Sequence, residues 1–272
     1  MLTTVFGAEG FVGAAIRDAL ISRGRPAIAP APGEIPDSPM GTVIYATSHV
    51  ANYGWANTST QIHDPLFLTA LLWSRRYTQF IYISSADVYL HQPSRAREVT
   101  NISVNTARLN ESTLLSLLSD EAACLHIAKA SKVVRLSRVY SDDGSEGGML
   151  GKMISDALTT KRISLPYTPD SGFDFLSIQN AVGAILHMVE STEHRCYNVG
   201  SGFNTQLADL SDCLRRLTGG LLQPSPAAPS HCPPPMSIDR AQTEFGFVGT
   251  NLVRDLPMIV RDRLHRTHTD AA

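Results

Sequence analysis

The feature that most constrains the fold is a glycine-rich turn between an apolar run and a helical pattern near the start of the chain. Leu2–Phe6 is a short run of apolar and β-branched residues, typical of a buried strand. Gly7, Gly10 and Gly13 follow, and the periodicity of Ala14–Arg23 predicts a helix. Such a turn leaves backbone N–H groups free at the helix N-terminus, where they favour a phosphate. The alternative is that the glycines only allow close packing of helix on strand.

Apolar runs and helical patterns alternate through the first half of the chain. Further strands are expected at Pro26–Ala29, Thr42–Thr47, Gln79–Ser85 and Lys132–Leu136, and helices at Ile62–Arg75 and Glu111–Leu118. This alternation with short connections predicts a parallel sheet with helices on both faces. The strands are continuous apolar runs, as strands covered on both faces should be. The predicted fold class is therefore α/β, with a Rossmann-type parallel sheet.

The second half of the chain has shorter and more interrupted patterns. Helices are expected at Gly147–Leu158, Ile178–Val189, Leu207–Leu217 and Leu252–His265, strands at Arg162–Leu165 and Cys196–Gly200, and a proline-rich connector at Gln223–Pro235. We expect residues 1–140 to form the Rossmann-like dinucleotide-binding domain and residues 141–272 a smaller C-terminal α/β part. Ile178–Val189 and Cys196–Gly200 are expected to return to the first domain.

Charge and composition exclude several kinds of partner. The 23 Lys and Arg residues against 25 Asp and Glu give a net charge of -2, so no basic excess indicates nucleic acid. No stretch approaches the roughly 20 apolar residues of a membrane span, and the N-terminus does not have the pattern of a signal peptide. Four scattered cysteines without metal-ligand spacing favour reduced thiols. We therefore expect a cytoplasmic protein with no nucleic acid, membrane or metal partner.

Several segments in chain order carry a resemblance to a known family. They include Gly7–Gly13 (G-A-E-G-F-V-G), Ile81–Tyr89 (I-Y-I-S-S-A-D-V-Y), Val133–Tyr140 (V-V-R-L-S-R-V-Y), Asp174–Ile178 (D-F-L-S-I) and Tyr197–Gly202 (Y-N-V-G-S-G). Together they resemble the nucleotide turn and later motifs of the extended short-chain dehydrogenase/reductase family, the NAD-dependent epimerases and dehydratases. The resemblance extends over nearly the whole chain.

The resemblance implies a cofactor, a substrate and the residues that contact them. The cofactor would be NAD or NADP, and the substrate a sugar-like or other small polar carbonyl compound bound by the C-terminal part. The implied cofactor-binding residues are Gly7, Glu9, Gly10, Phe11, Val12, Gly13, Ala46, Thr47, Ser84 and Arg108, and the implied substrate-binding residues are Tyr89, Arg138 and Phe173. Family members commonly form dimers, so a homodimer is a further implication.

The catalytic pair of this family, a Tyr four residues before a Lys, is absent. In the family the tyrosine transfers a proton while the nicotinamide takes or gives a hydride, and the lysine lowers the tyrosine pKa. The pair belongs between Glu98 and Glu111, but no Tyr lies between His91 and Ile127, and Lys129 is the first lysine. Arg108 falls at the Lys position, which puts Val104 at the Tyr position. Arg108 either holds a ribose or phosphate or is a solvated helix charge.

Two polar residues at the end of the fourth expected strand, Gln79–Ser85, are candidates for catalysis. Ser85 falls at the family's catalytic Ser or Thr, four residues before Tyr89. Asp87 falls where dehydratases of the family carry a Glu that acts as acid and base, and a carboxylate there can work without the tyrosine. The structural alternative is that both residues only cap the strand end, because Ser and Asp satisfy free backbone N–H groups well.

The region that normally builds the adenosine pocket is shortened. Family members carry a charged residue at the end of the second strand, but Ala29–Pro32 is uncharged. The stretch Pro30–Gly41 is too short for the usual helix and third strand, which need roughly 20 to 30 residues. We therefore expect a sheet trimmed around the third strand. Glu34 or Asp37 can replace the ribose contact, although the neighbouring prolines indicate a loop.

The substrate side departs from the family as well. Nucleotide-sugar enzymes use an Arg before the D-F pair to hold the diphosphate, and here that residue is Phe173. Arg138 remains as an anion contact. A diphosphate favours bidentate guanidinium groups, so a UDP- or TDP-sugar is less favoured than the resemblance alone implies.

Three functional interpretations follow from the sequence. The first is a divergent enzyme that binds NAD(P), with Ser85 polarising the substrate and Asp87 acting as acid and base. The second is a non-catalytic member of the family that serves as a nucleotide- or partner-binding module. The third is a non-redox enzyme in which the cofactor is absent or only structural. The sequence favours the enzyme only slightly. The resemblance implies a fold, and a fold alone does not determine function.

Overall fold

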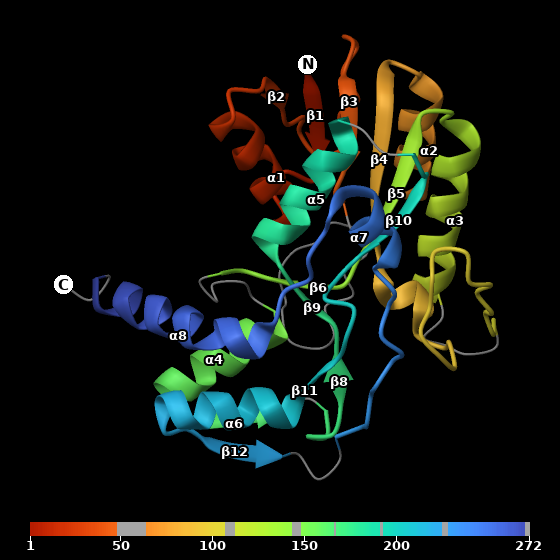
Figure 1. Ribbon diagram of the computed structural model, residues 1–272. Helices are drawn as coiled ribbons and strands as arrows, with labels where there is room; N and C mark the ends of the chain where they lie inside the picture. The colour runs from red at the N-terminus through yellow and green to blue at the C-terminus, as the bar shows by residue number, and fades with distance from the viewer. Residues whose placement is uncertain are drawn as a thin grey trace.

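A parallel β-sheet with helices on both faces lies above a smaller lobe (Figure 1). The computed structural model describes residues 1–47, 64–106, 112–142, 148–165, 167–190, 193–224 and 228–269. Among these residues, the sheet has six parallel strands in the order β10-β5-β4-β3-β1-β2. They are β1 (Thr3–Phe6), β2 (Ala27–Ile28), β3 (Gly41–Tyr45), β4 (Tyr77–Ser85), β5 (Ser131–Leu136) and β10 (Cys196–Val199). The predicted α/β fold class and Rossmann-type sheet are confirmed.

Alternation along each strand assigns its side chains to two separate cores. On β4, Ile81 and Ile83 pack with the helices α1 (Phe11–Ser22) and α5 (Ile178–Glu190). Phe80 and Tyr82 of the same strand point the other way. They pack with the helices α2 (Pro65–Ser74) and α3 (Ser112–Ile127), which cover the opposite face. The continuous apolar pattern of the strands is therefore explained by burial on both sides.

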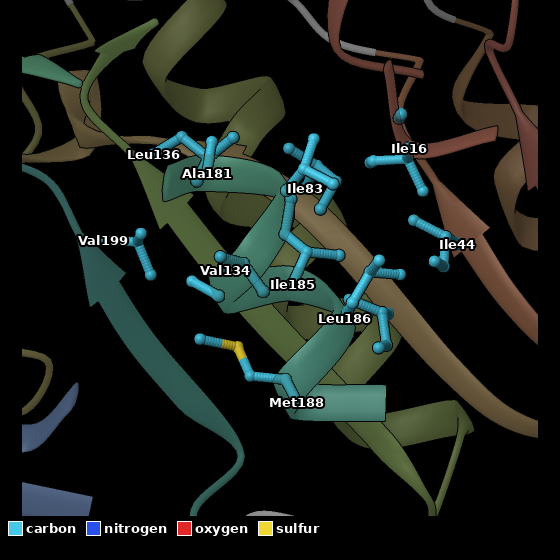
Figure 2. Packing of buried hydrophobic residues seen from close by; sticks show 14 of the residues in the cluster. Ile16, Ile44, Ile83, Val134, Leu136, Ala181, Ile185, Leu186, Met188 and Val199 are labelled. Carbon is cyan, nitrogen blue, oxygen red and sulfur yellow. The ribbon is translucent and has the colours of Figure 1, made fainter. Parts of the chain in front are cut away.

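The core between α5 and the sheet is made of aliphatic side chains from distant parts of the sequence. Figure 2 shows Ile185 and Leu186 of α5 beside Ile83 of β4 and Val134 of β5. Ile16 of α1 and Ile44 of β3 belong to the same cluster, and both are fully buried. Because the strands are parallel, the amino-terminal glycine turn after β1 and the carboxyl end of β4 lie on the same side of the sheet, where the strands end.

The sheet ends at β2, as the shortened sequence predicted. β2 pairs only with β1, and no helix or strand occurs in residues 29–40, all of which are described. The chain instead passes from β2 directly into β3 through the loop that contains Pro30 and Pro32. The expectation of a sheet trimmed around the third strand is confirmed.

The lower lobe is built from short elements around its own core. They are β6 (Arg138–Tyr140), α4 (Met149–Thr159), β7 (Arg162–Leu165), β8 (Gly172–Phe173), β9 (Phe175–Ser177), β11 (Thr205–Gln206), α6 (Leu207–Thr218), β12 (Leu221–Pro224) and α8 (Leu252–Thr269). The short helix α7 (Asp239–Phe245) instead lies beside β10 and packs with the core of α1 and α5. Side chains of α4, α6 and α8 form most of its core, and β7, β8 and β9 complete it. The chain leaves the main sheet after β5 and returns to it as β10, which pairs with β5.

The ends of several elements differ from the expected ranges for local physical reasons. α1 begins at Phe11, directly after the extended residue Gly10. α3 continues past the expected end at Leu118 to Ile127, because the polar residues Asp120 and Glu121 are buried with partners on the sheet. The expected connector Gln223–Pro235 contributes its first two residues to β12.

Two observations bear on membranes and metals. None of the helices in the described ranges combines the length and the apolar character that crossing a membrane requires. The same residues contain no cluster of three or more His, Cys, Asp or Glu side chains that could hold a metal ion. All four cysteines are free thiols.

Candidate functional site

The glycine turn has the geometry that its sequence predicts. Gly7 adopts a φ of +79°, and a Cβ there would lie 2.8 Å from the backbone carbonyl carbon of Ala46, the residue after β3. A Cβ on Gly13 would lie 2.0 Å from the Gly7 carbonyl oxygen. No side chain caps the N-terminus of α1, whose first residue is Phe11. The turn therefore places the N-terminus of α1 close to the carboxyl end of β1, where its free backbone N–H groups suit a phosphate.

A cavity of about 220 Å³ adjoins this turn at the carboxyl ends of β1 and β3. It is lined by Phe6, Gly7, Glu9, Pro30, Ala31, Pro32, Gly33, Tyr45, Thr47, Asp64 and Phe67. The proline-containing loop after β2 thus lines the pocket. It occupies the place of the helix and strand for which the stretch Pro30–Gly41 is too short. The pocket's position beside the phosphate turn and its aromatic and aliphatic lining suit the adenosine half of a dinucleotide.

The two acidic residues suggested as ribose contacts after β2 do not line this cavity. Asp37 is fully exposed and pairs with Arg76, with a carboxylate–guanidinium distance of 2.8 Å. Glu34 is also exposed on the loop. The described acidic residues that do line the cavity are Glu9 in the glycine turn and Asp64 at the start of α2. The Asp64 carboxylate also accepts a hydrogen bond from the Leu66 backbone N–H.

The other expected cofactor residues are placed in different ways. Thr47 lines the cavity, and Ala46 contacts the turn through its backbone. Ser84 instead lies buried on the α3 face of the sheet, where its hydroxyl donates to Glu121 Oε1 at 2.5 Å. Neighbouring residues on a strand point to opposite faces, which separates Ser84 from Ser85. Arg108 lies outside the described residues.

Ser85 and Asp87 lie together at the carboxyl end of β4. The Ser85 hydroxyl oxygen accepts a hydrogen bond from the Asp87 backbone N–H at 3.1 Å and caps the short 3-10 helix η1 (Ala86–Tyr89). Both side chains are half-buried. The capping role expected as the structural alternative is therefore present at Ser85, and its hydroxyl hydrogen is still available to donate to a ligand.

Tyr89, expected to contact substrate, belongs to a buried polar network. Only 1% of the residue is exposed. Its hydroxyl accepts a hydrogen bond from Arg135 and donates to Asn198 Oδ1 at 2.9 Å. Burial raises the pKa of Tyr89 to about 12. The position and the raised pKa both argue against Tyr89 as a substitute for the missing catalytic tyrosine.

Arg138 and Phe173, the other expected substrate residues, contact each other. The guanidinium carbon of Arg138 lies 4.4 Å from the centre of the Phe173 ring, a cation–π geometry. Phe173 is 1% exposed, whereas Arg138 is half-buried. The Phe173 ring thus stabilises the Arg138 guanidinium through this contact, and the ring itself is buried. The chain places a cation here through Arg138 on β6, although the family's arginine position is occupied by Phe173.

His231 and Tyr167 are two neighbours of this site that the sequence did not indicate. The His231 ring stacks on Phe173, with 5.3 Å between ring centres, and lies 5.5 Å from the Tyr167 ring. Its Nε2 atom is buried, and no hydrogen-bond partner for it occurs among the described residues. Asp87 and Arg138 act electrostatically on both rings. Tyr167 and His231 therefore lie within the electrostatic influence of one carboxylate, Asp87, and one guanidinium, Arg138.

The buried position of His231 predicts a pH-dependent contribution to stability. Burial, followed by the positive charge of Arg138, lowers the pKa of His231. The unfolded imidazole, with its ordinary pKa of about 6.5, then binds a proton more readily than the folded one, so stability falls as the pH drops through this region. We expect His231→Gln to weaken the loss of stability between about pH 7.5 and pH 5.5. Urea unfolding at both pH values measures this.

The matched control is His126→Gln, because His126 is exposed in the last turn of α3. It should leave the pH dependence of the free energy of unfolding as in the unmodified chain. An identical pH dependence in both variants would contradict the assignment to His231.

Comparison with known proteins identifies the fold. No protein-family model and no curated protein sequence matches the chain. Among solved structures, MoeE5 in complex with UDP-glucuronic acid and NAD is similar with a TM-score of 0.78 at 17% identity, over 98% of this chain and 100% of that chain. UDP-glucose 4-epimerase of Thermotoga maritima gives 0.74 at 16% identity, again over 98% and 100%.

A third similar structure is dTDP-glucose 4,6-dehydratase of Bacillus anthracis in complex with NAD. It has a TM-score of 0.75 at 15% identity and covers 99% of this chain and 98% of that chain. The chain therefore has the fold of extended short-chain dehydrogenase/reductase epimerases and dehydratases over nearly its full length.

Proposed function

We propose that this chain binds NAD or NADP and acts on a sugar-like or other small polar carbonyl substrate. The observation that carries the proposal is the glycine turn at the N-terminus of α1 together with the adjoining cavity at the ends of β1 and β3. Similar structures contain NAD at 15–17% identity, which supports the proposal through the shared fold. When bound, the nicotinamide would take or give a hydride.

The residues around Asp87 supply the rest of the proposed chemistry. Asp87 would act as acid and base, since a half-buried carboxylate at the carboxyl end of β4 can exchange a proton with a bound substrate. Ser85 would donate its hydroxyl hydrogen to a carbonyl or hydroxyl oxygen of the substrate. Arg138, held over Phe173, would bind a negatively charged or strongly polar group.

The second candidate function is a non-catalytic nucleotide- or partner-binding module. It is favoured by the missing Tyr and Lys pair and by the burial of Tyr89, which leaves that tyrosine unable to replace the lost one. The catalytic candidate requires a dinucleotide at the glycine turn, whereas a partner-binding module does not. They differ in whether Asp87 moves a proton during turnover.

Calorimetric titration of the purified chain with NAD⁺, NADH, NADP⁺ and NADPH tests the dinucleotide binding that the catalytic candidate requires. We expect at least one of the four to bind in a 1:1 ratio at the glycine turn. Binding of none of them would contradict the proposed function. The sample should also be heated and the released nucleotides identified, because a carried-over cofactor would mask binding.

Asp87→Asn tests the catalytic candidate. We expect it to lower turnover by about 10²- to 10⁴-fold, the usual contribution of general acid–base catalysis, while cofactor affinity is unchanged. Turnover is measured as reduced nicotinamide or altered sugar after incubation with a panel of nucleotide sugars and free sugars. Asp212→Asn, an exposed change on α6, is the control. Activity equal in both variants would remove Asp87 from the mechanism, and an inactive unmodified chain with intact cofactor binding would favour the second candidate.

A further inference from the structure

We propose that Glu9 binds the adenosine ribose and makes this chain select NAD over NADP. The inference rests on the proposed function, because it assumes a dinucleotide at the glycine turn. It assigns the role of the missing acidic residue after β2 to a residue inside the turn itself.

The placement of Glu9 is the first argument. Glu9 lies between Gly7 and Gly10 in the turn, and it lines the same cavity as the loop Pro30–Gly33. Its side chain is exposed and forms no ion pair within the described part of the chain. A carboxylate here can accept hydrogen bonds from the 2′- and 3′-hydroxyl groups of a ribose enclosed by the cavity.

The charge of the cavity lining is the second argument. Glu9 and Asp64 are acidic, and none of the described lining residues is basic. A phosphate monoester carries a charge of about -1.5 to -2 near neutral pH. NADP carries such a group on the ribose, so its 2′-phosphate would meet like charges without the arginine that commonly binds it. NAD carries hydroxyl groups at the same place and avoids this repulsion.

The loop Pro30–Gly33, which lines the same cavity, offers few hydrogen-bond donors to a phosphate. Pro30 and Pro32 have no backbone N–H, which removes two of the donors that a loop of this length normally provides. The acidic residues further along, Glu34 and Asp37, do not line the cavity. Of the two carboxylates in the described lining, that of Asp64 already accepts a hydrogen bond from the Leu66 backbone N–H, so we assign recognition of the ribose to Glu9.

Calorimetry with NAD⁺ and NADP⁺ tests this selectivity through binding alone. For the unmodified chain we expect NAD⁺ to bind at least about tenfold more tightly than NADP⁺, the ratio that about 1.4 kcal/mol of charge repulsion produces. Glu9→Arg should reduce the ratio at least about tenfold or reverse it, because a guanidinium attracts the 2′-phosphate. Glu9→Gln should weaken NAD⁺ binding and leave the melting temperature unchanged, since Glu9 makes no described hydrogen bond.

The matched control is Glu34→Arg, which makes the same charge change on the neighbouring loop outside the cavity lining. It should leave the NAD⁺ to NADP⁺ ratio close to that of the unmodified chain. Equal binding of both cofactors, tighter binding of NADP⁺, or the same ratio shift in both arginine variants would overturn the inference while the proposed function stands. Binding of neither cofactor would overturn the proposed function and the inference with it.

Discussion

Glu121→Gln is expected to lower the free energy of unfolding by about 3–5 kcal/mol, because it removes one charge of a buried ion pair and leaves the other uncompensated. The side chains of Arg135 and Glu121 are 8% and 5% exposed. Arg135 donates to both carboxylate oxygens, from Nε to Oε1 at 3.0 Å and from Nη2 to Oε2 at 2.6 Å. Few positions in the described chain combine such burial with a full opposite charge.

The cost is increased by the network that shares the pair. Ser84, Arg135 and Asn198 occupy adjacent register positions on β4, β5 and β10, so their side chains form one row on the α3 face of the sheet. Burial alone would lower the pKa of Arg135, but the hydrogen bonds and charge of Glu121 outweigh it and raise that pKa. The guanidinium therefore stays charged, and a neutral residue at 121 leaves it without its counterion.

Equilibrium urea unfolding of the single and double variants measures this effect. The double variant Glu121→Leu with Arg135→Met replaces both charges by apolar groups, and we expect it to regain most of the stability that Glu121→Gln loses. Tyr89 then loses its donor from Arg135 but keeps its bond to Asn198. A loss below about 1 kcal/mol in Glu121→Gln would show that the pair is not a major source of stability.

Gly13→Ala is expected to disrupt the glycine turn and lower the free energy of unfolding by about 3 kcal/mol, the upper end of the usual cost of overpacking. The new Cβ would lie 2.0 Å from the Gly7 carbonyl oxygen and 3.0 Å from the Ala8 nitrogen. Both obstacles are backbone atoms, so no side chain can move aside. α1 must shift away from β1, and the phosphate position at its N-terminus shifts with it.

Gly183→Ala is the matched control, because it is the same substitution in a helix with free space. Nothing lies within 4 Å of a Cβ at Gly183 on α5. Alanine favours a helix over glycine by about 1 kcal/mol, so this variant should be as stable as the unmodified chain or more so. Thermal unfolding and titration with NAD⁺ compare the two variants. Normal stability and cofactor affinity in Gly13→Ala would refute the tight packing of the turn.

The fold could be predicted because its signals are local. The run Thr42–Thr47 overlaps β3 (Gly41–Tyr45), since an apolar strand buried on both faces leaves a continuous pattern. Arg162–Leu165 matches β7 residue for residue, and its alternation of polar and apolar residues is that of a strand with one covered face. The trimmed sheet followed from the length of Pro30–Gly41 alone. The length of α3 did not, because buried Asp120 and Glu121 look like surface residues until their partners on the sheet are known.

The candidate site could be predicted only in part, because the rest depends on contacts between distant residues. Gly7 and Gly13 act within one turn, so their spacing was informative. The resemblance gave a position for Ser84 and for Tyr89 but not the direction of either side chain, and both point into the buried network. His231 lies in a proline-rich stretch without periodicity, and only the folded chain brings it to Phe173.

The return of β10 to the main sheet has a consequence for the order in which the chain can fold as it is made. β10 ends at Val199 and pairs with β5, which ends at Leu136. During synthesis, the edge of β5 that faces β10 therefore stays unpaired until the chain that forms α4 through α5 has been made. Unpaired strand edges favour association between chains. Until residues 137–199 have been synthesised, the β5 edge therefore lacks its native partner strand.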